Sequence, residues 1–162
     1  MFDYDIKNLS KALKKVGIKK NDNLLVHSSL GLFGKLKGIN KKKKLAQIFF
    51  KEIKKIIGKN GNIIVPTFTY SLFNNKTFIK NKSESNMGIF SEYVRLKKDS
   101  VRNNDPNFSI SANGPFKKKF AKDNINFDTY SKDSFFAKFH ELNGKILNLN
   151  FPGTTIIHFY EK

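Results

Sequence analysis

The chain has 162 residues, no cysteine and a formal net charge of +18, with 31 lysines and arginines against 13 acidic residues. The lack of cysteine excludes disulfides, thiolate metal sites and a cysteine nucleophile, and an apolar content of 39% argues against a disordered polyelectrolyte. No apolar run approaches the roughly 20 residues of a membrane span, and the first residues do not look like a signal peptide, so we expect a cytoplasmic protein.

The first part of the chain predicts two helices and two strands. Apolar residues recur at helical spacing over residues 6–16 and again over residues 45–57, and a glycine follows each stretch where a helix should end. Residues 24–26 and 62–65 are short apolar runs preceded by turn residues, which is typical of buried strands, and Pro66 ends the second one.

The second part predicts a long loop and then shorter elements. Residues 67–86 are polar and irregular, and loops of this length are often functional. We expect a helix over residues 87–94, a strand over 109–112, a short helix around 116–120 and a strand over 145–149. Strand-like and helical segments alternate, which favours an α/β fold with a mixed, largely parallel sheet flanked by helices. No linker divides the chain, so residues 1–162 are expected to form a single domain, and a homo-oligomer stays open.

The high positive charge does not by itself indicate a nucleic-acid partner. Only Arg95 and Arg102 are arginine, and the rest of the basic residues are lysine. The lysine runs at 41–44 and 117–119 are interpreted as solvated faces at helix ends. Weak attraction to polyanions at low salt follows from the charge, but no nucleic-acid recognition motif is present, so no specific nucleic-acid binding is expected.

Polar residues follow the first predicted strand. His27, Ser28, Ser29 and Leu30 lie at its carboxyl end, the position where open α/β sheets bind ligands. Two hydroxyls beside glycines could hold a phosphate or an amide of a ligand, although such a stretch also suits a capped strand end. Thr67, just beyond Pro66, could face the same cleft.

The segment from Arg102 to Ser109 is the next group of polar residues. In a chain that otherwise uses lysine, an arginine suggests planar, bidentate contacts, so Arg102 could clamp a phosphate or fix Asp105. A turn that begins at Asp105 and Pro106 is the alternative. Glu92 and Arg95, three residues apart on a predicted helix, could form a surface ion pair.

The last candidate group lies at residues 153–161. His158 and Glu161 are three residues apart and would share a helical face, so Glu161 could fix the tautomer of His158 and leave the other ring nitrogen as a general base. The alternative is a packed histidine without a catalytic role. The three histidines of the chain are too scattered to suggest a metal cluster, so no metal is expected.

These segments match the aminoglycoside 3-N-acetyltransferase family in order. Residues 23–34 (NLLVHSSLGLFG) resemble its first strand and coenzyme A-contacting loop, and residues 61–68 (GNIIVPTF) resemble its next core strand. Residues 87–114 resemble its methionine-glycine helix and arginine-led loop, and residues 141–161 resemble the segment that ends in its histidine.

The resemblance implies transfer of an acetyl group from acetyl-coenzyme A to an amine of an amino sugar. His158 then matches the catalytic base, and Glu161 matches its carboxylate partner. The coenzyme site would include residues 27–30 together with Arg102 and Ser109. Thr154 or Thr155 could stabilise the oxyanion, as could backbone N–H groups.

Two further expectations concern the acceptor and the length of the chain. Resistance enzymes of the family usually carry histidine-proline where this chain has Asp105-Pro106. An excess of bases over acids also suits an anionic, nucleotide-linked amino sugar better than a polycationic aminoglycoside. We therefore favour surface-polysaccharide biosynthesis in a bacterium over antibiotic resistance. Family members continue beyond the histidine segment, so the chain is expected to be truncated at its C-terminus and weakly active, or an inactive remnant of the fold.

Overall fold

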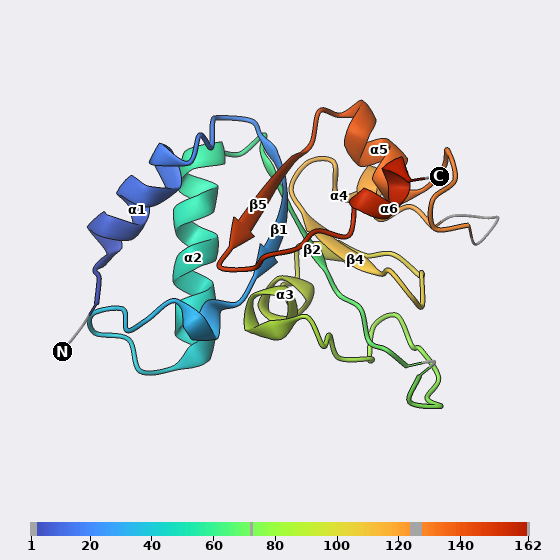
Figure 1. The fold of residues 1–162 in the computed structure, drawn as a ribbon, viewed down its shortest axis with the longest axis horizontal. Coiled ribbons are helices and arrows are strands. Elements are labelled where there is room, and N and C mark those ends of the chain that lie inside the picture. Colours follow the sequence, from blue (N-terminus) through green and yellow to red (C-terminus); the bar gives the residue numbers. More distant parts are fainter. Residues whose placement is uncertain (1–2, 72, 124–127, 162) are drawn as a thin grey trace.

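The centre of the molecule is a five-stranded sheet with the strand order β3-β4-β2-β1-β5 (Figure 1). A computed structural model describes residues 3–71, 73–123 and 128–161, except for the side chain of His158. Strands β1, β2 and β5 run parallel to one another, whereas β4 is antiparallel to β2 and β3 is antiparallel to β4. The mixed α/β fold predicted from the sequence is thus confirmed. The strands are β1 (Asn23–Ser28), β2 (Asn62–Pro66), β3 (Ser100–Arg102), β4 (Ile110–Asn113) and β5 (Lys145–Leu149).

Helices cover both faces of the sheet, and each face has its own apolar core. Leu24 and Val26 of β1 pack with α1, α2 and α3, while Leu25 points to the other face, which is covered by α4, α5 and α6. This alternation follows from the two-residue period of a strand that is buried on both faces. The helices are α1 (Ile6–Lys15), η1 (Leu30–Leu32, a 3₁₀ turn), α2 (Lys42–Ile57), α3 (Gly88–Arg95), α4 (Lys117–Phe120), α5 (Phe135–Glu141) and α6 (Ile157–Tyr160).

The two long helices near the N-terminus end as the sequence predicts. Gly17 follows the C-cap of α1 with a φ of 88°, and Gly58 is the C-cap of α2 with a φ of 70°, so both adopt positive φ, which glycine tolerates best. The lysines of residues 41–44 are exposed where α2 begins, in agreement with their interpretation as a solvated helix end.

Strand β3 and helix α5 are not predicted by the sequence patterns, and neither is the short turn η1. Strand β3 has only three residues and lies at the edge of the sheet, so it carries too few positions for a period to be visible. Helix α5 begins at Ser134, whose hydroxyl accepts a hydrogen bond from the Ala137 amide, and it buries three phenylalanines. Among the described helices, none is both long enough and apolar enough to cross a bilayer.

Candidate functional site

The carboxyl ends of the three parallel strands meet at one edge of the sheet, and a cavity of about 420 Å³ opens there. Ser28 of β1 is in register with Leu149 of β5, and the Ser29 amide donates to the Leu149 carbonyl at 2.9 Å. This edge is where open α/β sheets bind ligands. The residues that line the cavity are His27, Ser28, Ser29, Leu30, Gly31, Lys42, Pro66, Tyr70, Asn86, Met87, Gly88, Ile89 and Phe151.

All four residues that the sequence assigns to the end of β1 line this cavity. The hydroxyl oxygen of Ser28 is enclosed and has no hydrogen-bond partner within the described part of the chain. Leu30 begins η1 and is only 2% exposed, so most of its side chain belongs to the core. An enclosed hydroxyl without a partner costs about 1–3 kcal/mol.

The start of α3 forms the wall opposite Ser28. Gly88 has a φ of 87°, and a Cβ atom added there would lie 3.7 Å from the carbonyl oxygen of Ser28. A contact of this length is an ordinary one, so it is the positive φ of Gly88 that favours glycine at this position.

His27 lies under the segment that follows β5. Its imidazole is 3% exposed and stacks on the ring of Phe151, with the ring centroids 5.6 Å apart. Its Nε2 atom is 3.4 Å from the hydroxyl oxygen of Thr154. Burial lowers the pKa of His27 from 6.5 to about 4, so the ring is neutral at physiological pH. A neutral ring can share a hydrogen bond with Thr154 or with a ligand.

The segment after β5 therefore folds back onto the end of β1. Thr154 and Thr155 are half-buried there, and the chain then enters α6. His158 lies in α6, but its side chain is outside the described residues, so its role stays a prediction. Glu161 is the C-cap residue of α6, one helical turn after His158.

A second cavity, of about 400 Å³, lies beside the loop that precedes β4. Because Ile110 of β4 pairs with Pro66 of β2, this loop reaches the same edge of the sheet as the first cavity. Tyr130 is close to this second cavity, where its ring contacts Phe108 and stacks on Phe136. Burial raises the pKa of Tyr130, and the carboxylates of Asp105 and Glu161 raise it further.

Asp105 organises the turn in front of β4. Its carboxylate accepts hydrogen bonds from the amides of Asn107 and Phe108 at 2.9 and 2.8 Å, and from the Thr129 hydroxyl at 3.1 Å. The turn interpretation of Asp105 and Pro106 is therefore confirmed, and the interpretation that Arg102 fixes Asp105 is wrong.

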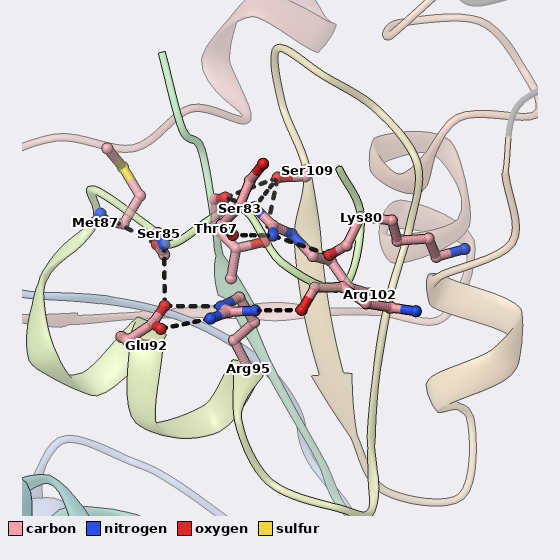
Figure 2. Close-up of polar contacts among 10 residues, drawn as sticks. Thr67, Lys80, Ser83, Ser85, Met87, Glu92, Arg95, Arg102 and Ser109 are labelled. Carbon is pink, nitrogen blue, oxygen red and sulfur yellow. Dashed lines mark hydrogen bonds and ion pairs between the residues drawn. The ribbon is translucent and has the colours of Figure 1, made fainter. Parts of the chain in front are cut away.

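Arg102 instead anchors the long loop of residues 67–86 (Figure 2). Its guanidinium donates to the carbonyls of Lys80 at 3.1 Å, Ser83 at 2.6 Å and Thr67 at 2.5 Å. It also donates to the Ser109 hydroxyl at 3.1 Å and lies over the ring of Phe78. Arg102 is 5% exposed, and burial lowers its pKa to about 10, aided by the charge of Arg95 and opposed by Glu92. The planar geometry expected of this arginine is present, but its acceptors are backbone carbonyls of the protein.

Arg95 and Glu92 bind the same loop from α3. The two side chains form a bidentate pair with N···O distances of 2.8 and 2.5 Å, and Glu92 also accepts from the Ser85 amide at 2.9 Å. Arg95 donates to the Asn81 carbonyl at 3.3 Å. Its side chain is only 6% exposed, so the expected ion pair exists but is mostly buried and not a surface feature.

Three sequence-based site assignments consequently change. Thr67 is fully buried and shares a hydrogen bond with Ser109, so it does not face a cleft. Arg102 and Ser109 do not line the first cavity, because their polar groups bind Thr67 and the loop. These residues support the cavity indirectly, since the loop that they hold supplies Tyr70 and Asn86 to its wall.

Several lining residues were not singled out from the sequence. Tyr70 and Asn86 belong to the loop whose length was the only signal, and Phe151 follows a strand whose carboxyl end shares the edge with β1. Lys42 belongs to the lysine run 41–44, whose pattern predicts only a solvated helix end. Within the described residues, no three histidine, aspartate or glutamate side chains lie close enough together to bind a metal.

Comparison with known proteins identifies related sequences and folds. The sequence profile of the aminoglycoside 3-N-acetyltransferase family matches residues 25–162. No curated protein sequence matches the chain.

Solved acetyltransferase structures share the fold. Aminoglycoside acetyltransferase AAC(3)-IIb is 18% identical with a TM-score of 0.83, over 99% of this chain and 65% of that one. AAC-IIIb in a binary complex with CoASH is 19% identical with a TM-score of 0.80, over 98% and 64% of the two chains. AAC-VIa bound to sisomicin is 20% identical with a TM-score of 0.82, again over 98% and 64%. The present chain thus spans slightly less than two thirds of the length of these proteins.

Proposed function

The chain belongs to the aminoglycoside 3-N-acetyltransferase family, and on this basis we propose that it transfers an acetyl group from acetyl-coenzyme A to an amine of an amino sugar. The observation that carries the proposal is the cavity at the end of β1, where the Ser28 hydroxyl lacks a partner and Thr154 meets His27. Acetyl-coenzyme A suits this cavity because the thioester at the end of its slender pantetheine arm could lie beside His27, which lines the cavity. The AAC-IIIb complex with CoASH supports the choice of coenzyme.

In the proposed reaction the amine nitrogen attacks the thioester carbonyl carbon directly. A carbon–nitrogen bond forms, the carbon–sulfur bond breaks, and coenzyme A leaves with the sulfur. His158 takes the proton from the amine, and Glu161 holds the histidine in the correct tautomer. Neutral His27 lines the cavity and lies 3.4 Å from the Thr154 hydroxyl, so these two groups would be the donors for the carbonyl oxygen as it gains negative charge.

Substitution of the proposed base tests this mechanism. We expect His158→Gln to lower turnover of labelled acetyl-coenzyme A by about 10²–10⁴-fold, which is the usual contribution of a general base, without loss of coenzyme A binding. His140→Gln is the matched control: His140 of α5 shares a hydrogen bond with the Tyr160 hydroxyl of α6, so an equal loss in both variants would indicate a disturbed α6 and not a lost base. Equal turnover by the His158 variant and the wild type would remove His158 from the mechanism. Coenzyme A binding without any turnover by the wild type would identify the chain as a non-catalytic member of the family.

For the acceptor, we favour an anionic amino sugar of the kind used in polysaccharide biosynthesis. The net charge of +18 favours an anion. The two acids that line the second cavity already have partners, so they are not free to bind a cationic acceptor. Asp105 accepts hydrogen bonds from backbone amides, and Asp123 pairs with Lys80 at 3.2 Å. An aminoglycoside is the second candidate, supported by the sisomicin bound to AAC-VIa. Acetylation of a nucleotide-linked amino sugar in preference to sisomicin would support the first, and the opposite preference would support the second.

A further inference from the structure

Four exposed apolar side chains lie at or beside the cavity at the end of β1. Tyr70 and Phe151 line the cavity, and both are exposed. The ring of Phe73 contacts the ring of Tyr70, with the centroids 6.4 Å apart, and Phe73 is 87% exposed. Leu32 belongs to η1, the turn after β1, and is 75% exposed, and its carbonyl accepts a hydrogen bond from the Asn150 side chain at 3.2 Å. We call Leu32, Tyr70, Phe73 and Phe151 the apolar rim.

Folded backbone holds the two most exposed members of the apolar rim in place. Leu32 is the last residue of η1, and its amide donates to the Ser29 carbonyl at 3.0 Å. In the loop, the amide and the side chain of Asn74 both donate to the Tyr70 carbonyl, at 3.1 and 3.0 Å, so Phe73 lies in a closed turn. The fold therefore keeps these apolar side chains in solvent, and exposed apolar groups that lie together mark a contact with a protein or a membrane.

The segments that carry Leu32, Tyr70 and Phe73 are strongly basic. Residues 29–44 contain six lysines and no acid, whereas residues 67–86 contain three lysines and one acid, Glu84, so the two segments carry +8 of the net charge of +18. The six lysines of residues 29–44 are all exposed, and none belongs to an ion pair among the described residues. One acid, Asp3, lies beside them and accepts from the Lys35 amide at 2.6 Å. Both segments lie along the lower side of the molecule in Figure 1, beyond the end to which β1 points.

We propose that this edge of the molecule docks on an anionic lipid bilayer, with Leu32 and Phe73 among the acyl chains and the lysines of residues 29–44 at the headgroups. Apolar and basic side chains together match the two layers of such a surface, because apolar groups enter the acyl region while long lysine side chains reach the charged headgroups. Tyr70, with an apolar ring and a polar hydroxyl, suits the boundary between the layers. A nucleic acid is the less suitable partner, because it offers no apolar region for Leu32.

A tryptophan probe tests whether Phe73 enters the bilayer. The chain has no tryptophan, so Phe73→Trp supplies a single fluorescent reporter. With vesicles of phosphatidylglycerol and phosphatidylcholine in a ratio of about 1:2, we expect its emission to move to shorter wavelength and lipids brominated on the acyl chain to quench it. Phe116→Trp is the matched control, because Phe116 is exposed and its amide binds Asn62 at the amino end of β2, the opposite edge of the sheet. No response from the Phe73→Trp protein, or an equal response from both, would overturn the proposal.

Removal of apolar side chains measures what they contribute to the affinity. We expect Leu32→Ser with Phe73→Ser to weaken binding to the same vesicles about tenfold or more in sedimentation assays. Val16→Ser with Phe116→Ser is the matched control, since Val16 ends α1 and both residues are exposed apolar residues outside the apolar rim, so this variant should bind like the wild type. If the first pair bound as tightly as the wild type, charge alone would attract the vesicles and the docking of the apolar rim would be refuted.

A change of charge tests the face and the class of partner. We expect Lys35→Gln with Lys37→Gln to weaken vesicle binding about tenfold at low salt, and Lys118→Gln with Lys119→Gln of α4 to weaken it much less. Equal losses in the two pairs would mean that the vesicles respond only to net charge, which contradicts the proposed face. Tighter binding of an oligonucleotide than of vesicles, sensitive to the change at Lys35 and Lys37, would identify a nucleic-acid surface and overturn the bilayer assignment. Vesicle binding is measured without acetyl transfer, so this inference and the proposed function can fail separately.

Discussion

His27 shows how a single buried side chain sets a pH dependence. The ring is enclosed between Phe151 and the end of β1, and its pKa is lowered to about 4 by burial. The unfolded chain binds a proton near pH 6.5, whereas the folded chain binds it only near pH 4. Unfolding therefore takes up a proton between these values, so the folded state becomes less stable as the pH falls from 6.5 to 4.

Replacement of the ring tests this dependence. We expect His27→Phe to keep the stack on Phe151. As the pH falls from 6.5 to 4, the free energy of unfolding should decrease in both proteins, but by about 3 kcal/mol less in His27→Phe than in the wild type. Urea unfolding at several pH values measures the difference, and carboxylates that titrate in both proteins cancel from it. His140→Phe serves as the control at an exposed histidine. The same acid slope in His27→Phe and the wild type would contradict the assignment.

At the residue scale, the sequence correctly predicts the place of a site residue where a local pattern determines that place. His27 and Ser28 end a strand with a clear apolar run, so their place at the ligand edge follows from the strand alone. The assignment of Arg102 and Ser109 to the coenzyme site is wrong for the opposite reason. Their acceptors lie as far as 42 residues away in the chain, in a loop without periodicity, so no local pattern could predict that these side chains bind protein instead of ligand.

At the scale of elements, the loop of residues 67–86 depends on two arginines. Arg102 from β3 and Arg95 from α3 together bind the carbonyls of four loop residues (Figure 2), and the base of the loop is closed by Asn86, which bonds to Phe68 and Thr69. Because Tyr70 and Asn86 form part of the cavity wall, the order of the site depends on these bonds. The described part of the loop is thus held by specific hydrogen bonds, although its sequence predicts only an irregular segment.

Substitution by lysine tests the loop anchor. Lysine keeps the charge of Arg102 but has one ammonium group in place of a planar fork, so it cannot serve acceptors that lie in several directions. We expect Arg102→Lys to lower the free energy of unfolding by about 2–4 kcal/mol, since buried carbonyls lose charged donors. Amide hydrogen exchange should also become faster in residues 73–86.

Arg95→Lys is the matched comparison, because lysine can still form an ion pair with Glu92. Its loss of stability and its effect on exchange in the loop should both be smaller. If Arg102→Lys cost no more than Arg95→Lys, the carbonyl contacts would contribute little, and the loop would be held mainly by its own packing.

The fold was predictable to the extent that its elements were long. Helices α1 and α2 and strands β1, β2 and β5 follow from apolar periodicity and from the glycines and proline that end them. The pairing of β4 with β2, and the return of the segment after β5 onto His27, depend on contacts between distant parts of the chain. A period of two or of 3.6 residues carries no information about such contacts.

On the scale of the whole molecule, the net charge of +18 sets two opposing responses to salt. Lysines dominate the charge, and only four ion pairs join lysine or arginine to acids among the described residues. Like charges repel more strongly in the compact state than in the unfolded chain, so the charge lowers the stability of the protein without ligand. The same charge attracts the phosphates of a coenzyme.

Added salt should therefore raise the melting temperature of the free protein and reduce the extra stabilisation by coenzyme A. From about 0.05 M to about 0.5 M sodium chloride the Debye length falls from roughly 14 to roughly 4 Å, which screens repulsion between exposed lysines. Attraction between the positively charged protein and the phosphates of coenzyme A would be screened in the same way, so the shift in melting temperature that a fixed coenzyme A concentration produces should shrink. Thermal denaturation with and without coenzyme A measures both effects in one series. In Lys42→Glu with Lys43→Glu the rise in melting temperature with salt should be smaller, because the net positive charge is lower. A coenzyme A shift that is independent of salt in the wild type would mean that the coenzyme is held without its phosphates, by the cavity beside Ser28 alone.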